Sequence, residues 1–190
     1  MEKELLQQNL QKLMDKALAM GASAAKVVSV PQIKTGAWTR MKCQYGCPNY
    51  GSNLCCPPYT PDYEATQKFL SEYQYGIIVE YTMELPEGAG PGAFTSADLK
   101  MSNGLLEILL GLERDAFLLN NYRSFALKAG RCRLCDKCNL QKCVNPTKAR
   151  PSLEACGIDV FALANDNGFK MEVITGPIKE LKIYGLLLVE

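Results

Sequence analysis

The first 20 residues carry apolar side chains at spacings of three and four, which is the pattern of an amphipathic helix. The repeating positions are Leu6, Leu10, Leu13, Met14, Ala17 and Leu18. We therefore expect a helix over residues 2–20 that ends at Gly21, since glycine readily adopts the left-handed conformation that closes helices. The apolar run 27–30 predicts a strand that Pro31 stops.

The next helix is expected to begin at Thr60, because Pro61 and Asp62 come directly after it and favour a first helical turn. Four residues form its expected inward face: Ala65, Phe69, Leu70 and Tyr73. Gly76 is expected to close this helix. The run 77–83 is rich in β-branched and aromatic residues and predicts a strand.

The longest helix is expected to extend to about residue 119. Thr95 and Asp98 resemble a capping box at its start. The apolar residues in its middle face every direction, so we expect this helix to be buried on most sides. Gly104 and Gly111 are seven residues apart, so they lie on one face and would allow a close approach of another segment.

The last third of the chain predicts one helix and two strands. Residues 151–168 are expected to be helical up to a stop at Asn167, and a strand is expected near residues 169–174. The run 183–190 is too apolar for the edge of a sheet, so we place it centrally. Residues 38–58, by contrast, are expected to form a loop.

Together these elements predict an α+β fold, with a small mixed β-sheet packed with helices. The length of 190 residues and the hydrophobic content of 47% suit a single domain over residues 1–190. Two cysteine-rich loop segments, residues 43–58 and residues 130–150, could converge into a metal-binding lobe.

Nine cysteines and no histidine determine which chemistry to expect. Structural disulfides are uncommon in reducing compartments, so nine thiols indicate metal or redox chemistry. Without histidine, any metal must be held by thiolate, with carboxylate or water as a supplement. The start of the chain lacks the apolar core of a signal peptide, and no run reaches the about 20 apolar residues of a membrane span. We therefore expect a cytoplasmic protein without a membrane partner.

The stretch GRCRLCDKCNLQKC places Cys132, Cys135, Cys138 and Cys143 at gaps of two, two and four residues. Three cysteines at successive gaps of two can reach three irons of a [4Fe-4S] cluster, and bacterial ferredoxins use this spacing. The last gap is one residue longer than in ferredoxins, which leaves open whether Cys143 binds the same cluster. Tetrahedral zinc on the same thiolates is the alternative cofactor, and a redox dithiol of Cys132 and Cys135 is another interpretation.

The earlier group contains Cys43, Cys47, Cys55 and Cys56. Adjacent Cys55 and Cys56 point in different directions, so one of them is expected to be spare. The three remaining thiols form a candidate second metal site, whose fourth ligand could be Cys156, Cys143, another group or none. Without a fourth ligand, an exposed iron could bind substrate. A structural zinc or unligated buried thiols would explain the same residues.

Positive charge is concentrated around the second group, although the whole chain has 21 basic and 20 acidic residues. The basic residues are Lys128, Arg131, Arg133, Lys137, Lys142, Lys148 and Arg150. Nearby cations stabilise a negatively charged cluster, and the run 128–150 could also dock an acidic redox protein. An ordinary solvated face is the alternative. No aromatic residue interleaves this run, so nucleic acid is not an expected partner.

Several motifs together carry a resemblance to one protein family. They are CQYGCPNYG with CCPPYTP, AFLLNNYRSFALKAGRCRLCDKC with KCVNPTKARPSLEACGIDV, and YGLLLVE. From about Lys42 to Glu190, the chain resembles a cysteine-rich family of predicted metal-binding proteins of archaeal and anaerobe type, domain of unknown function 2284. The resemblance implies that thiolates bind a metal and that the expected cofactors are iron-sulfur clusters. It also implies a role in anaerobic metabolism. It supports seven ligands: Cys43, Cys47, Cys56, Cys132, Cys135, Cys138 and Cys143.

The leading interpretation is an iron-sulfur protein that acts in electron transfer or as a small redox component, with one or two [4Fe-4S] clusters. Seven supported cysteines are one short of two fully ligated clusters, since Cys55 and Cys156 are less regular in the family pattern. We therefore expect a complete cluster on the four-cysteine run and an incompletely ligated site on the first group, where any catalysis would occur. Two alternatives stay open: a zinc-binding structural or adaptor protein without catalytic activity, and a protein that handles metal or sulfur.

Overall fold

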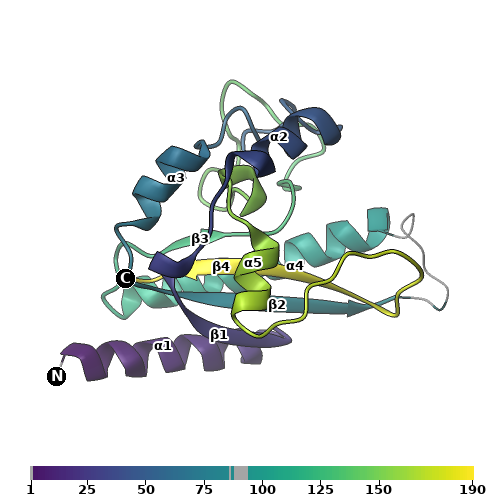
Figure 1. Ribbon diagram of the computed structural model, residues 1–190. Coiled ribbons are helices and arrows are strands. Elements are labelled where there is room, and N and C mark those ends of the chain that lie inside the picture. Colours follow the sequence, from purple (N-terminus) through teal and green to yellow (C-terminus); the bar gives the residue numbers. More distant parts are fainter. Residues whose placement is uncertain (1, 86, 88–93) are drawn as a thin grey trace.

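The computed structural model describes residues 2–85, 87 and 94–190 of the chain (Figure 1). In chain order the helices and strands are α1 (Glu2–Ala19), β1 (Ala24–Ser29), η1 (Val30–Gln32), α2 (Ala37–Gly46), α3 (Tyr63–Leu70), β2 (Tyr75–Glu84), α4 (Phe94–Leu118), β3 (Phe125–Leu127), η3 (Glu154–Cys156), α5 (Val160–Asp166) and β4 (Glu180–Leu188). Within these described ranges, no helix is both long enough and apolar enough to cross a membrane.

The four strands form one sheet in the order β1, β2, β4, β3. The prediction of a central last strand is confirmed, because β4 lies between β2 and β3 and its last five residues are buried. The fold class is α+β, as predicted. The expectation of a mixed sheet is wrong for the described strands, since each strand runs antiparallel to every neighbour it pairs with.

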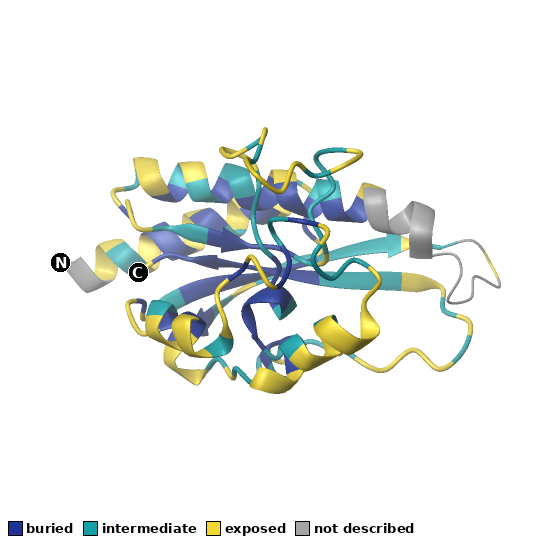
Figure 2. Ribbon diagram, turned by 90° about the horizontal axis from the view of Figure 1, so that it is seen from above, coloured by how far each residue is buried: buried dark blue, intermediate teal, exposed yellow. Residues whose placement is uncertain are grey.

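Helices α1 and α4 cover one face of the sheet (Figure 1). Successive residues of a strand point to opposite faces, and in β2 Ile77 and Val79 pack toward these helices while Ile78 packs on the other side. Leu13 of α1 and Leu109 of α4 belong to the same buried cluster as Ile77. Figure 2 shows buried residues concentrated in the strands and exposed residues on the outer sides of the helices. The apolar periodicity of α1 therefore marks its contact with the sheet.

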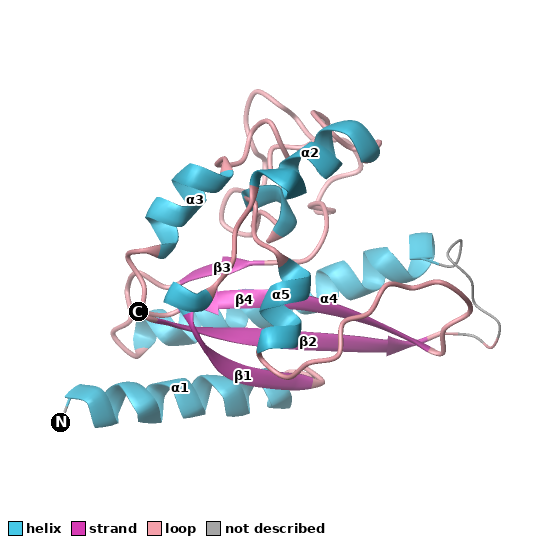
Figure 3. Cartoon of the chain, in the orientation of Figure 1, coloured by secondary structure: helices cyan, strands magenta, loops and turns pink. Residues whose placement is uncertain are grey.

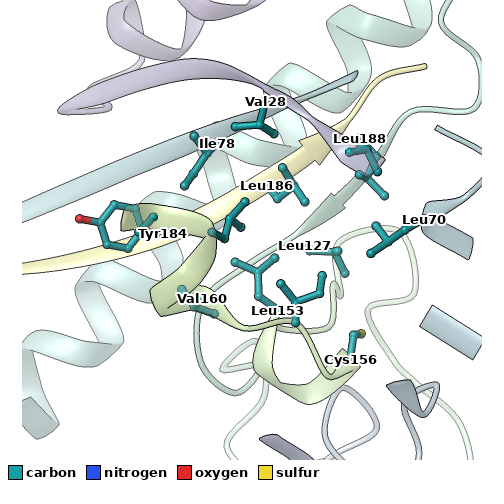
Figure 4. Packing of buried hydrophobic residues seen from close by; sticks show 14 of the residues in the cluster. Val28, Leu70, Ile78, Leu127, Leu153, Cys156, Val160, Tyr184, Leu186 and Leu188 are labelled. Atoms are coloured by element: carbon teal, nitrogen blue, oxygen red, sulfur yellow. The ribbon is translucent and has the colours of Figure 1, made fainter. Parts of the chain in front are cut away.

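The opposite face of the sheet carries α3, η3, α5 and the cysteine-rich loops. Figure 4 shows Ile78, Leu186 and Leu188 of the sheet packed against Leu153 and Val160 from the segments that cover it. These residues are at most 7% exposed. The apolar cluster supports the loops above it, so the position of the cysteine lobe is set by an ordinary hydrophobic core.

Two predictions about glycines are confirmed, one by backbone conformation and one by close packing. Gly21 follows the end of α1 with a φ of 99°, a left-handed value that favours glycine. A Cβ atom at Gly104 would lie 2.8 Å from the hydroxyl of Tyr81, and one at Gly111 would lie 2.6 Å from the Cε of Met20. The absence of a Cβ atom at both glycines of α4 therefore leaves room for Tyr81 and Met20, which pack there. The predicted capping box of Thr95 and Asp98 lies outside the described side chains.

The region after β1 contains a helix that the sequence did not predict. Residues 38–58 were expected to be a loop, but α2 covers Ala37–Gly46. The one residue of α2 that is buried is Thr39, so no apolar stripe reveals this helix in the sequence. β1 also begins earlier than expected, at Ala24, and Val30 lies in η1 rather than in the strand.

Helix α3 begins later than predicted. Its N-cap is Asp62, whose Oδ1 accepts a hydrogen bond from the N–H of Ala65 at 2.8 Å. Thr60 instead donates its hydroxyl to the carbonyl of Ala155. The expected inward position of Ala65 is wrong, because Ala65 is exposed and Thr66 is buried. Gly76 lies inside β2 and does not close the helix, which ends at Leu70.

The predicted helix over residues 151–168 is broken into η3 and α5. Gly157 separates them with a φ of 87°, and Tyr63 packs where a Cβ atom would stand. The strand expected near residues 169–174 is absent. Asn165 provides the physical reason, since its side chain donates to the carbonyl of Met171 and accepts from the N–H of the same residue. These backbone groups are then no longer available to a sheet ladder.

A buried polar pair on the sheet gives a first testable prediction. Tyr184 is 1% exposed and donates its hydroxyl to a carboxyl oxygen of Glu80 at 2.8 Å. The Tyr184→Phe variant is expected to lower the free energy of unfolding by about 1–3 kcal/mol, because Glu80 stays buried without this donor. Urea unfolding at pH 7 measures the change, with the exposed Tyr122→Phe as the matched control.

The same pair predicts a pH dependence. Burial and the hydrogen bond to Glu80 raise the pKa of Tyr184 well above its usual value of 10. A raised pKa in the folded state means that the neutral phenol stabilises the protein fully below pH 10, and that this contribution is lost progressively as the pH rises above 10. The stability difference between wild type and Tyr184→Phe should therefore shrink above pH 10. A difference that is constant with pH would contradict this account.

Candidate metal centre

Two cysteine segments that are distant in the sequence lie side by side over β3. Figures 1 and 3 show α2 and the loop after it next to the long loop that joins β3 to η3. Asn53 of the first segment donates from its side-chain amide to the carbonyl of Cys132 in the second, at 3.1 Å. The two segments therefore form one lobe, as the sequence suggested.

The loop that carries the second group is closed at its neck by backbone hydrogen bonds. The N–H of Lys128 donates to the carbonyl of Pro151, and the N–H of Leu153 donates to the carbonyl of Lys128. These bonds join the end of β3 to the segment before η3. They fix both ends of the cysteine loop on the hydrophobic core that Leu153 enters.

The first group consists of Cys43, Cys47 and Cys56. Cys43 lies in the last turn of α2, and Cys47 is the C-cap residue, whose N–H donates to the carbonyl of Cys43 at 3.3 Å. Burial, and then the neighbouring Cys47 and Cys43, raise the pKa of Cys56 to about 11. Burial and Cys47 likewise raise the pKa of Cys43. The three thiols are therefore electrostatic neighbours, and Cys47 is exposed at the surface.

The second group contains one thiol more than the sequence suggested. A small hollow is lined by Cys55, Cys132, Cys135, Cys138 and Cys143. A hydrogen bond from the thiol of Cys55 lowers the pKa of Cys132 to about 6, and the same contact raises the pKa of Cys55. Adjacent Cys55 and Cys56 thus belong to different groups. The expectation that they point in different directions is confirmed, whereas the idea that one is spare finds no support in this arrangement.

A buried ammonium group lies between the two groups. Lys128 is 0% exposed, and its Nζ donates to the carbonyls of Ala129, Gly130 and Arg131 at 2.7, 3.0 and 2.8 Å. Its positive charge lowers the pKa values of both Cys56 and Cys132. Lys128 therefore shapes the loop and favours thiolates on both sides.

Two of the seven basic residues considered for partner docking are engaged inside the protein. Lys128 is fully buried, as described above. Arg150 forms two hydrogen bonds with the carboxylate of Glu113, the Nε bond being 2.9 Å long, and packs over the ring of Phe125. Its side chain is 12% exposed. The run 128–150 is therefore not one continuous docking face, and its exposed lysines are Lys137, Lys142 and Lys148.

Asparagine side chains contact two of the sulfur atoms. Asn145 donates from Nδ2 to the Sγ of Cys135 at 3.2 Å, and Asn49 approaches the Sγ of Cys47 at 3.9 Å. Hydrogen bonds to sulfur stabilise the thiolate and tune a bound metal. Sequence reasoning missed Asn53 and Asn145, because nothing in the sequence distinguishes these asparagines from ordinary loop residues.

The described thiols of each group lie near one another, but they do not surround a common point as bound ligands would. Among the described residues, no three cysteine, aspartate or glutamate side chains stand in a metal-holding arrangement, and all nine cysteines are free. The donor set nevertheless fits a thiophilic metal such as iron or zinc. The Nε–H of Arg131 is buried without an acceptor in the described part of the chain, and Arg131 lies close enough to Cys56 to lower its pKa. An anionic sulfur centre would provide that acceptor.

Fold and lobe together define a cysteine-rich α+β protein in which eight thiols, three in the first group and five in the second, gather over one end of a four-stranded sheet. The chain belongs to the family described as Predicted metal-binding protein (DUF2284), whose family model matches residues 26–189. This match confirms the resemblance found in the sequence. Comparison with curated proteins gives no match, and comparison with solved structures gives none either.

Proposed function

We propose that the protein binds iron-sulfur clusters and acts in electron transfer. In this proposal Cys132, Cys135, Cys138 and Cys143 hold a [4Fe-4S] cluster, and Cys43, Cys47 and Cys56 form a second metal site. One observation carries the proposal: the four thiols of the loop line a single hollow. Backbone hydrogen bonds fix both ends of this loop on the core. Loop thiolates at this spacing suit a cubane better than a tetrahedral zinc.

The surrounding residues support a negatively charged centre. A four-iron cluster held by thiolates exchanges single electrons. The buried ammonium of Lys128 stabilises negative charge near Cys132, and the amide of Asn145 donates to Cys135. Both contacts favour the reduced, more negative state of a bound cluster and would therefore raise the reduction potential of that cluster. Free thiols also suit a reducing compartment, so the proposal places the protein in the cytoplasm.

The first group is proposed as the site of any catalysis. It offers three thiols, and Cys47 is exposed, so a metal bound there would keep a position open toward solvent. Exposed apolar side chains surround this part of the surface, including Trp38, Met41 and Tyr45. An open metal position with an apolar rim could bind a substrate or a partner.

A redox partner is proposed to dock at Lys137, Lys142 and Lys148. These lysines are exposed on the loop that holds the second group. Changing all three to Gln is expected to slow reduction by an acidic one-electron carrier protein about tenfold at low salt, because electrostatic steering is lost. Stopped-flow reduction of the loaded protein measures this rate, and Lys12, Lys68 and Lys170 changed to Gln provide the matched control. Equal rates and equal salt dependence in both triple variants would contradict the docking site.

The cofactor itself is tested by the optical spectrum of protein purified without oxygen. The proposal predicts a brown protein with broad visible absorption that bleaches when dithionite is added. A zinc protein would be colourless, because the d shell of zinc is full. A colourless protein that holds zinc would therefore contradict the proposal and favour a structural or adaptor role.

A further inference from the structure

The pair Cys55 and Cys56 connects the two groups of thiols. Cys56 lies with Cys43 and Cys47, whereas Cys55 lines the hollow of the second group and contacts Cys132. The sequence left Cys55 without a role, and the proposed ligand set above does not include it. Its position in the structure calls for one.

We propose that Cys55 is a metal ligand of the second group, able to complete the thiolate set of Cys132, Cys135 and Cys138 from the other cysteine segment. This inference rests on the proposed function, because it assumes that the second group binds a metal. It adds a ligand that comes from outside the four-cysteine loop.

The backbone around Cys55 is held in place by one asparagine. Asn53 is 7% exposed, and its Oδ1 accepts the N–H of Cys55 at 2.9 Å while its carbonyl accepts the N–H of Cys56. The side-chain amide of the same Asn53 donates to the carbonyl of Cys132. A single buried side chain thus fixes Cys55 relative to Cys132. Such positioning of a ligand by its neighbours is typical of metal sites.

The number of thiols supports an exchange of ligands at this site. Five thiols line the hollow, whereas a four-iron cluster or a tetrahedral zinc needs four. Cys132, Cys135 and Cys138 have the compact spacing that places three ligands on one centre. Cys143 follows after a longer gap, so Cys55 and Cys143 are the two candidates for the fourth position. Either one can complete the set.

A consequence is that the two metal sites are joined by one peptide unit. Cys55 would bind at the second site and Cys56 at the first. No other pair of adjacent residues in the chain contributes cysteines to both groups. The Cys55–Cys56 peptide then gives a short covalent connection between the sites.

The test compares metal and sulfide content, per folded chain, in anaerobically purified wild type, Cys143→Ala and the double variant Cys55→Ala/Cys143→Ala. Cys143→Ala should keep the metal of the second group, because Cys55 then takes the fourth position that the proposed function gives to Cys143, and the double variant should lose it. The proposal is overturned if Cys143→Ala alone loses that metal, or if the double variant keeps it. Circular dichroism of each metal-free variant checks that the fold is retained.

A second measurement uses the metal-bound Cys143→Ala variant, in which Cys55 is the remaining candidate for the fourth position. Iodoacetamide should leave Cys55 of this variant unmodified while the metal is bound and alkylate it after chelation, as read by mass spectrometry. The core residue Cys156 should resist in both states, because it is 3% exposed. Alkylation of Cys55 with the metal bound would also overturn the assignment. Wild type that holds no metal at all would instead refute the proposed function, so the two failures can be told apart.

Discussion

Lys128→Met is expected to lower the free energy of unfolding of the metal-free protein by about 2–4 kcal/mol. The ammonium of Lys128 donates three hydrogen bonds to consecutive carbonyls at the start of the cysteine loop, and hydrogen bonds to charged groups contribute more than neutral ones. Methionine fills a similar volume but donates nothing, so these carbonyls lose their partner. Urea unfolding at pH 7 measures the loss.

The same variant is expected to bind metal more weakly. Lys128 lowers the pKa values of Cys56 and Cys132, so its removal makes the thiolates of both groups harder to form. Lys137→Met is the matched control, since Lys137 is exposed on the same loop. The control should unfold within about 0.5 kcal/mol of wild type. If Lys128→Met behaves like the control in both assays, the buried ammonium does not organise the lobe.

Cys135→Ala is expected to remove the metal of the second group while the first group keeps its own. Cys135 is the middle member of the compact run and accepts the amide of Asn145, whereas Cys55 and Cys143 are both candidates for the fourth position and not for that of Cys135. Under the proposed function, the variant should lose about four iron and four sulfide per chain. Elemental analysis of anaerobically purified protein measures both.

The control for this variant is Cys156→Ala. Cys156 is the last residue of η3 and lies in the core that packs against the sheet, with a pKa that burial raises to about 12 (Figure 4). Its replacement should reduce stability slightly and leave the metal content unchanged. Equal metal loss in Cys135→Ala and Cys156→Ala would mean that the effect comes from unfolding and not from a lost ligand.

The sequence predicted those parts of the fold in which apolar periodicity coincides with burial. The spacing of Leu10, Leu13 and Ala17 located α1, and all three are at most 1% exposed. The apolar run in β4 indicated a central strand for the same reason. Helix α2 escaped prediction, because its apolar residues Trp38 and Met41 face solvent instead of the core.

The candidate site was predicted only as far as ligand spacing allows. The gaps between Cys132, Cys135 and Cys138 identified the second group from local sequence alone. Contacts between distant segments leave no such local pattern, so the position of Cys55 beside Cys132 could not be foreseen. Lys128 was grouped with surface charges, because a buried lysine is rare and its neighbours in the sequence include other basic residues.

The central claim is that the lobe holds iron-sulfur clusters, and it is tested most directly by measuring iron, zinc and acid-labile sulfide per chain on anaerobically purified protein. The account predicts equal amounts of iron and sulfide, about four of each if the second group alone holds a [4Fe-4S] cluster and about eight if both groups do. Zinc without sulfide would contradict it. In that case the metals would have a structural role in the lobe, and the function of the protein would have to be sought on its surface.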